Sequence, residues 1–286
     1  MTTNNLPTTI DLNEFQAFIE STKVSQEDLN GGGDFLPQLK VNYQDELEVD
    51  GVKKEIKPGL FTLTGQEIPS FAKNVAFRPL LMNYQYIDYD KAADKVVNRS
   101  IIFNAFSDEA RDELGTVRCG KPPSKELKEN ADLKKQWEHV SLYRSIDGLV
   151  SYIGTDADGN EVKVENVLCT FRGKGVNFSP FQDEYLKLMP KGTFIWDFEL
   201  KLGTTKHKQD PKSAVSYYVV HFEADFTTRI PLTQDVWEKI KELKARVDST
   251  NKEINNKYYE AIEARNNATT AAIIDATDTL DSEFGE

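Results

Sequence analysis

Short runs of β-branched and aromatic residues, bounded by Gly, Pro, Asn and Asp, fill the chain between residues 35 and 231. Runs of this length and composition are typical of β-strands, and the bounding residues are those that turns require. The predicted strands are 35–43, 60–64, 75–89, 101–106, 140–153, 162–171, 193–202 and 216–230. The pattern therefore predicts a β-rich body over 35–231, with a hairpin turn at the glycine-containing segment 154–160 and a helical insertion over 124–138.

The residues that follow Pro231 have a helical pattern instead. Thr233 can accept hydrogen bonds from the first N–H groups of a helix, and Leu232 and Trp237 occupy the positions of a hydrophobic staple. Apolar residues then recur at steps of four and three, at Val236, Ile240, Leu243, Val247 and Ile254. This stripe predicts a long C-terminal helix over 232–268, which packs on the protein's own sheet or joins a second copy as a coiled coil.

Both ends of the chain are acidic, and the body between them is nearly neutral. The net charge is −12, yet residues 1–34 hold six acidic residues and one basic residue, and residues 270–286 hold five acidic residues and no basic one. We expect a mobile N-terminal arm over 1–34. We also expect a disordered acidic tail over 269–286, because a segment of mainly Ala, Thr and Asp buries little apolar surface.

Composition excludes several classes of protein. A hydrophobic share of 39% allows a sizeable core, while no apolar run approaches the roughly 18 residues of a membrane span. The N-terminus has no secretory signal pattern, so the expected location is the cytoplasm, without a membrane partner. Two cysteines and three histidines, none at metal-ligand spacing, predict reduced thiols, no metal site and no cofactor.

One segment, 171–181, combines basic residues, glycines and aromatic rings as a nucleic-acid site requires. Arg172 and Lys174 can attract phosphate, and Phe178 and Phe181 can stack on bases, each stacked base contributing about 1–3 kcal/mol. The alternative is a strand end whose rings belong to the core.

Two further clusters share this composition. Arg78, Tyr84 and Tyr86 lie in the predicted strand 75–89, where core packing is the structural alternative. Basic residues and tyrosine also recur around a predicted turn, which is otherwise an ordinary solvated loop, at Lys201, Lys206, Lys208 and Tyr217. The three clusters together predict single-stranded DNA binding without sequence preference and without catalysis.

The enzymatic alternative depends on Asp197, Glu199 and Lys201. If all three lay on one face of a strand, the carboxylates could hold Mg²⁺ and the lysine could stabilise a scissile phosphate, as in a nuclease. No local signature indicates a Ser/His/Asp or Cys/His arrangement, so we expect a protein that is not an enzyme.

The acidic tail offers a site for a basic partner. Its candidate contacts are three carboxylates and one ring, Asp278, Asp281, Glu283 and Phe284. Such a tail can compete with phosphate for the protein's own basic groove, can dock on a partner protein with the ring as anchor, or can simply increase solubility.

The chain resembles the single-stranded DNA-binding proteins of bacteriophages through Asp281-Ser282-Glu283-Phe284, although Gly285 and Glu286 follow the ring and that family ends on its aromatic residue. It is also similar to phage proteins at 35–40, 117–121 and 171–173. The resemblance implies an α+β, β-dominated fold with an OB-like β-barrel. It implies a role in DNA replication or recombination in the host cytoplasm, with the tail inhibiting DNA binding and recruiting replication partners.

A structural function is the rival expectation. A virion or scaffold protein could assemble as a homo-oligomer through the stripe on the C-terminal helix. The two functions predict different responses to salt, because phosphate contacts release counterions and an assembly protein need not bind an oligonucleotide.

Overall fold

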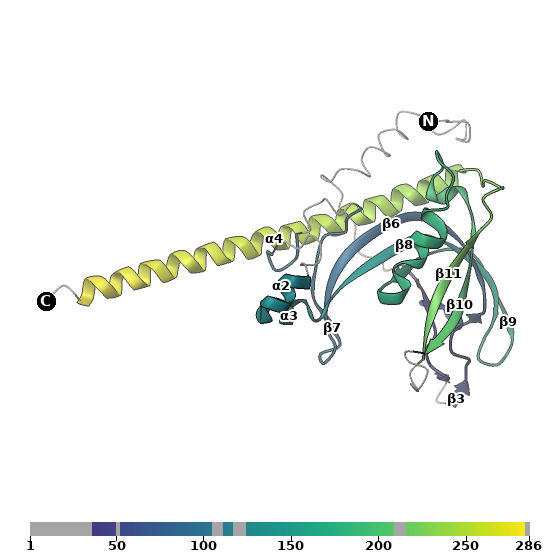
Figure 1. Cartoon of the computed structure of the whole chain (residues 1–286), viewed down its shortest axis with the longest axis horizontal. Coiled ribbons are helices and arrows are strands. Elements are labelled where there is room, and N and C mark those ends of the chain that lie inside the picture. The colour runs from purple at the N-terminus through teal and green to yellow at the C-terminus, as the bar shows by residue number, and fades with distance from the viewer. Residues whose placement is uncertain (1–35, 50–51, 105–110, 117–123, 209–215, 284–286) are drawn as a thin grey trace. The chain divides into compact units, whose positions relative to one another are not determined.

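The computed structural model describes residues 36–49, 52–104, 111–116, 124–208 and 216–283, so the arm predicted over 1–34 lies outside the described residues. The strands are β1 (Gln38–Val41), β2 (Glu46–Val49), β3 (Val52–Glu55), β4 (Phe61–Leu63), β5 (Phe71–Ala72), β6 (Val75–Asp90), β7 (Lys95–Arg99), β8 (Val140–Thr155), β9 (Glu161–Gly173), β10 (Leu200–Lys208) and β11 (Ser216–Ala224). The helices are α2 (Ser124–Glu129), α3 (Ala131–Trp137) and α4 (Gln234–Glu283), and the short helical segments are η1 (Gly175–Asn177), η2 (Phe181–Leu186) and η3 (Ile195–Asp197) (Figure 1). The fold is thus mixed and strand-rich, with a long C-terminal helix.

The chain divides into two compact units that share three elements. Within the described ranges, the first unit comprises residues 36–84 and 143–246, and the second comprises residues 85–142 and 247–283. Strands β6 and β8 and helix α4 run from one unit into the other.

The large sheet has the strand order β11-β10-β6-β8-β5-β4-β1-β9, and β7 pairs with β6. Strand β9 also pairs with β8, from Arg144 opposite Gly173 to Thr155 opposite Glu161. Since β1 is parallel to β9 and antiparallel to β4, and β5 joins β4 to β8, the pairings close a circuit β1-β4-β5-β8-β9. The predicted hairpin turn at 154–160 is confirmed, with Gly159 at φ +84°.

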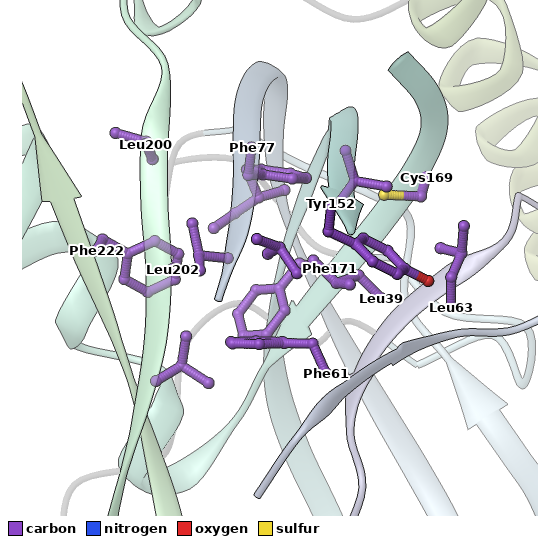
Figure 2. Close-up of a cluster of buried hydrophobic side chains, with 14 of the residues drawn as sticks. Leu39, Phe61, Leu63, Phe77, Tyr152, Cys169, Phe171, Leu200, Leu202 and Phe222 are labelled. Atoms are coloured by element: carbon purple, nitrogen blue, oxygen red, sulfur yellow. The ribbon is translucent and has the colours of Figure 1, made fainter. Parts of the chain in front are cut away.

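The first unit has an aromatic core enclosed by this circuit and by β6, β10, β11 and η2 (Figure 2). Its buried rings include Phe61, Phe77, Phe171, Phe181, Phe198 and Phe222. Leucines on the same strands, such as Leu39 and Leu202, fill the spaces between the rings. Each such side chain contributes about 1.5–3 kcal/mol on burial, so this cluster supplies much of the stability of the unit.

The start of helix α4 covers the opposite face of the sheet. The Val236 N–H donates to Thr233 Oγ1 at 3.3 Å, which confirms the predicted cap. Leu232, Trp237 and Ile240 are buried, and the stripe of α4 packs on Leu80 of β6 and Leu149 of β8. The first half of the predicted stripe is therefore buried within the protein's own fold.

The second unit has its own buried residues. Tyr86 stacks on Phe103, with ring centroids 5.8 Å apart, and makes an edge contact with Trp137. Asn251 of α4 accepts a hydrogen bond from Ile102 N–H at 2.7 Å and donates one to Ile102 C=O at 2.8 Å. These contacts fix the chain around residue 102 on the helix.

The structure differs from the sequence expectations in several places. Strands β2, β3, β5 and β7 were not predicted, because all four are short and β2, β3 and β7 are rich in charged residues. The strand predicted over 193–202 is wrong in its first part, which contains the short helix η3, and β10 begins only at Leu200. The run at 101–106 forms an isolated bridge at residue 103 and no strand in its described part. Helix α4 does not end at 268 but continues to Glu283, so the described backbone of 269–283 is helical rather than disordered. Ala-rich sequence without Gly or Pro favours this continuation.

Arg78 ties β6 to the segments around it. Its Nε donates to Trp196 C=O at 2.8 Å, and its Nη2 donates to Pro231 C=O at 3.0 Å and to Ile230 C=O at 3.4 Å. The side chain is 8% exposed. Arg78 therefore anchors the entry to helix α4 and is not presented to a ligand.

Replacing Arg78 should accordingly unfold the protein more easily. We expect Arg78→Met to lower the free energy of unfolding by about 2–4 kcal/mol, because charge-assisted bonds are lost and the buried Trp196 C=O is left without this donor. Urea denaturation measures the change. Exposed Arg172→Met is the matched control, with an expected change below about 0.5 kcal/mol. Equal stability of the two variants would contradict the anchoring role.

Candidate nucleic-acid interface

A row of polar residues crosses strands β8, β9, β1 and β4 on the side opposite the aromatic core. Leu39 lies opposite Phe171, and both side chains are buried in that core. Because side chains alternate along a strand, the next residues, Lys40 and Arg172, point to the other face, where both are exposed. Arg172 lies opposite Ser145, and Lys40 lies opposite Thr62.

Lys174 extends this surface beyond the end of β9. Its Nζ donates to Tyr143 Oη at 2.9 Å and lies 5.1 Å from the centroid of that ring. We refer to Lys40, Tyr143, Arg172 and Lys174 as the basic face. Within the described ranges, neither Lys40 nor Arg172 takes part in a salt bridge, so both charges remain available to an anionic ligand.

A second polar patch occupies the end of the β10–β11 pair, where Lys206 lies opposite Tyr218. His207 and Tyr217 stack on one another, with centroids 5.6 Å apart. On the other face, Tyr218 makes an edge contact with Tyr43 at 5.9 Å, and the Tyr43 side chain is 56% exposed. We name this patch the hairpin end, and its members are Tyr43, Lys206, His207, Lys208, Tyr217 and Tyr218.

Asn177 connects the two patches. Its Nδ2 donates to Tyr218 C=O at 3.1 Å, and its Oδ1 accepts the Val220 N–H at 2.7 Å. The amide thereby pairs with the outer edge of β11 as a neighbouring strand would, which protects that edge. Asn177 lies in η1, three residues after Lys174, so the end of the basic face is joined through this amide to the strand that carries Tyr217 and Tyr218.

Gly59 holds the Tyr218 ring close to the backbone. Its φ is +89°, a conformation that favours glycine, and a Cβ at this position would overlap the ring of Tyr218. Thr204 Oγ1 donates to Gly59 C=O at 2.6 Å and fixes the same loop on β10. The ring is thus held in position while part of it stays accessible.

Asp147 is buried between the basic face and helix α4. Burial raises the pKa of its carboxyl to about 6, while a hydrogen bond from Thr170 and the charges of Arg172 and Arg246 oppose the shift. The side chain is 8% exposed. Asp147 is the buried acid whose charge acts on Arg172, so it offsets part of the positive potential of the basic face.

Three of the aromatic residues that the sequence nominates for base stacking belong to the core. Tyr84, Tyr86 and Phe181 are each at most 5% exposed. These three rings and the anchored Arg78 are therefore unavailable to a ligand. The role of the rings is core packing, which was the alternative interpretation of the sequence pattern. Their spacing could not reveal this, because a stacking surface and a core use the same aromatic residues.

Phe178 has an intermediate position. The Arg144 guanidinium lies 4.5 Å from its centroid and 5.4 Å from that of Tyr84. Arg144 Nη1 also donates to Phe178 C=O at 2.7 Å. The half-buried Phe178 ring is therefore clamped by a buried arginine at the edge of the core.

Lys201 is exposed but lies apart from the hairpin end. It is five residues from Lys206 on the same strand, about 16 Å at the usual rise per residue. Its Nζ is 4.0 Å from Glu223 Oε2, so its charge is partly compensated. Lys201 is therefore at most a peripheral member of the interface.

The nuclease arrangement does not form. Asp197 belongs to the short helix η3, whereas β10 begins at Leu200, so Asp197, Glu199 and Lys201 do not share one strand face. The Asp197 carboxylate accepts the Phe194 N–H at 3.1 Å and is buried. Among the residues that the structure describes, no three His, Cys, Asp or Glu side chains are grouped to hold a metal ion.

The predicted tail falls largely within the last helix. The backbone of Asp278, Asp281 and Glu283 belongs to helix α4, and Phe284 lies outside the described residues. No helix in the described part of the chain has both the length and the apolar character that a membrane crossing requires.

Comparison with known proteins gives no match. No family model fits the chain, and searches of curated proteins and of solved structures return no significant similarity. The basic face and the hairpin end are therefore the features of the chain that indicate a function.

The sequence did not indicate several members of the interface, namely Lys40, Tyr43, Tyr143 and the amide of Asn177. Alternation along 38–41 predicts that Lys40 faces away from Leu39, so its exposure was accessible in principle. The contacts of Tyr43 and Asn177 with Tyr218 join residues far apart in the chain, and no local pattern indicates them.

Replacing Asp147 should change the pH dependence of stability. A carboxyl with a pKa raised from 3.8 to about 6 stabilises the fold in its protonated form, and stability is lost as pH rises from about 4 to 6. Asp147→Asn should therefore be more stable than the parent above pH 6, by about 1–3 kcal/mol, and should show a flatter profile. Urea denaturation at several pH values measures this.

Asp156→Asn is the matched control, because hydrogen bonds from Asn160 lower the pKa of Asp156 in the exposed turn. Removal of the Asp156 carboxylate should not stabilise the protein at neutral pH. A neutral-pH stability of Asp147→Asn at or below that of the parent would contradict the prediction.

Proposed function

We propose that the first unit binds single-stranded DNA without sequence preference and that the protein acts in phage-type replication or recombination. The observation that carries the proposal is that the basic face and the hairpin end each combine exposed basic residues with accessible tyrosines. Such a surface matches the two chemical features of a single strand, a charged backbone and flat bases.

The residue types indicate which side chains would contact phosphate and which would contact bases. The cations suited to phosphate are Lys40, Arg172, Lys174, Lys206 and Lys208. The rings suited to bases are those of Tyr43, Tyr217 and Tyr218, which are exposed or half-buried. Stacking tolerates every base because each has a flat face, so this surface favours binding without sequence preference.

The closed circuit of strands supports the finer proposal of an OB-like barrel. Five-stranded OB barrels bind oligonucleotides on an outer strand face bordered by loops. Here the basic face lies on the outer side of β8, β9 and β1, and Asn177 joins its end to β11 in the hairpin end. The proposal is compatible with the pairings, including the parallel pair of β1 and β9.

The alternative function, that of a virion or scaffold protein that assembles through helix α4, has less support from the described residues. Val236, Ile240 and Leu243 are each at most 5% exposed and pack in the protein's own cluster. A coiled coil through this stripe would require them to leave it. The nuclease alternative lacks its shared strand face. No specific observation favours either function over DNA binding.

Titration with oligo-dT tests the proposal. We expect binding that weakens with salt, with a slope of log affinity against log salt of about −3.5 if about five phosphates are contacted, since single strands give about −0.7 per phosphate. Lys40→Ala, Arg172→Ala and Lys206→Ala should each make the slope shallower by about 0.7. Tyr43→Ala should reduce affinity about fivefold to 100-fold with little change in slope.

Lys163→Ala is the control, because Lys163 is exposed, lies on β9 and pairs with Glu165 at 2.6 Å. It should leave affinity and slope unchanged. The absence of oligo-dT binding by the parent protein at low salt would refute the proposal.

The acidic C-terminal segment is proposed to compete with DNA and to recruit basic replication proteins, as its five carboxylates suggest. A chain that ends at Thr270 should then bind oligo-dT more tightly than the full chain, with the larger gain at low salt. Fluorescence titration of both forms measures the difference. Identical affinities would exclude competition and leave recruitment to be tested by pull-down with the same two forms.

A further inference from the structure

The second unit contains an exposed tyrosine that is clamped by an arginine. The Arg111 guanidinium lies 5.5 Å from the ring centroid of Tyr259, and Arg111 Nη1 donates to Tyr259 Oη at 2.7 Å. Tyr258 completes the cluster with an edge contact to Tyr259 at 5.3 Å. The Tyr259 side chain is nevertheless 53% exposed.

A ring that is fixed yet exposed is suited to stacking. An ordinary exposed tyrosine loses rotamer freedom when a base stacks on it, whereas the contacts with Arg111 and Tyr258 already restrict the Tyr259 ring. The guanidinium at one side of the ring adds a cation–π contact, which a nucleobase on the accessible part of the ring would extend.

Two other cations of the second unit are paired with carboxylates. Lys257 Nζ lies 2.9 Å from Glu113 and 2.7 Å from Glu253, and Arg99 pairs with the same two carboxylates. These two cations therefore add little net attraction for phosphate, and the cation at the Tyr259 ring is Arg111, which contacts both tyrosine rings.

We propose that Tyr259, held by Arg111 and Tyr258, is a second base-stacking platform for single-stranded nucleic acid, located in the second unit. This inference rests on the proposed function and adds a subsite to it. The platform should contribute chiefly when the oligonucleotide is longer than the first unit alone can occupy, because linked sites raise affinity only when one ligand engages both.

The test uses the full chain and oligo-dT of two lengths, about 8 and about 40 nucleotides, because single OB-type sites take about 4–16 nucleotides. Tyr259→Leu keeps apolar volume but removes the aromatic face. It should reduce affinity for the long oligonucleotide about fivefold or more, leave the short one unchanged and leave the salt slope unchanged. Tyr259→Phe, which loses only the hydroxyl, should bind the long oligonucleotide more tightly than Tyr259→Leu.

Two controls separate a stacking role from a structural one. Leu114→Ala removes an exposed apolar side chain of the same unit, 48% exposed, and should change neither affinity. Photocrosslinking with iododeoxyuridine in the long oligonucleotide should label Tyr259 in the parent protein. Thermal unfolding verifies that each variant is folded.

The possible failures are distinguishable. If the parent binds oligo-dT and Tyr259→Leu binds each length as tightly as the parent does, the second platform is refuted and the proposed function stands. If crosslinks form only in the first unit, the conclusion is the same. If the parent binds neither oligonucleotide at low salt, the proposed function fails and the platform with it.

Discussion

The two-sided burial of the β8–β9 pair is the constraint on which the first unit depends. Ile146 and Val150 of β8 point into the aromatic core, and Leu149 between them points to the cluster under helix α4. A strand buried on both faces needs apolar residues at successive positions, and the α4 stripe supplies the second cover. The cover includes Leu243, and three residues later Arg246 lies close enough to act on Asp147. Beyond the part that helix α4 covers, the outer face of β8 and β9 becomes polar, and the basic face begins there.

The basic residues of the first unit's outer face lie on the part of it that helix α4 does not cover. The chain carries a net charge of −12, which by itself opposes binding to a polyanion. Local potential, however, is set by residues within about a Debye length, roughly 8–10 Å. Lys40, Arg172 and Lys174 share one face, and the acid that acts on Arg172 is the buried Asp147, whose raised pKa reflects the cost of its ionisation there. A surface can thus attract phosphate although the whole molecule is acidic.

The sequence predicted what local chemistry determines. Periodicity located β6, β8, β9 and α4, and turn residues located the β8–β9 hairpin, because these signals depend on neighbours in the chain. It could not separate the two faces of a strand that is buried on both, so Arg78 and Tyr84 of β6 were predicted to bind a ligand although they are buried. Phe181 of η2 was predicted to stack on a base for its residue type, and it is also buried. The sequence located the basic residues and tyrosines of the hairpin end but not Tyr43, since Tyr43 and Tyr218 meet only in the folded structure.

Accessible rings in this protein are fixed by contacts that leave part of their surface free. Tyr43 is in edge contact with Tyr218, whose ring lies over Gly59, and Tyr259 is held by Arg111. A freely moving aromatic side chain on a surface contributes nothing to stability, and ordering it on binding costs about 0.5–1.5 kcal/mol. Because these contacts already order the rings in the folded protein, this entropic cost arises on folding and not on binding. Such clamps are hard to explain as packing, because the clamped rings of Tyr43 and Tyr259 are more than half exposed. They are simple to explain if a flat ligand completes the stack.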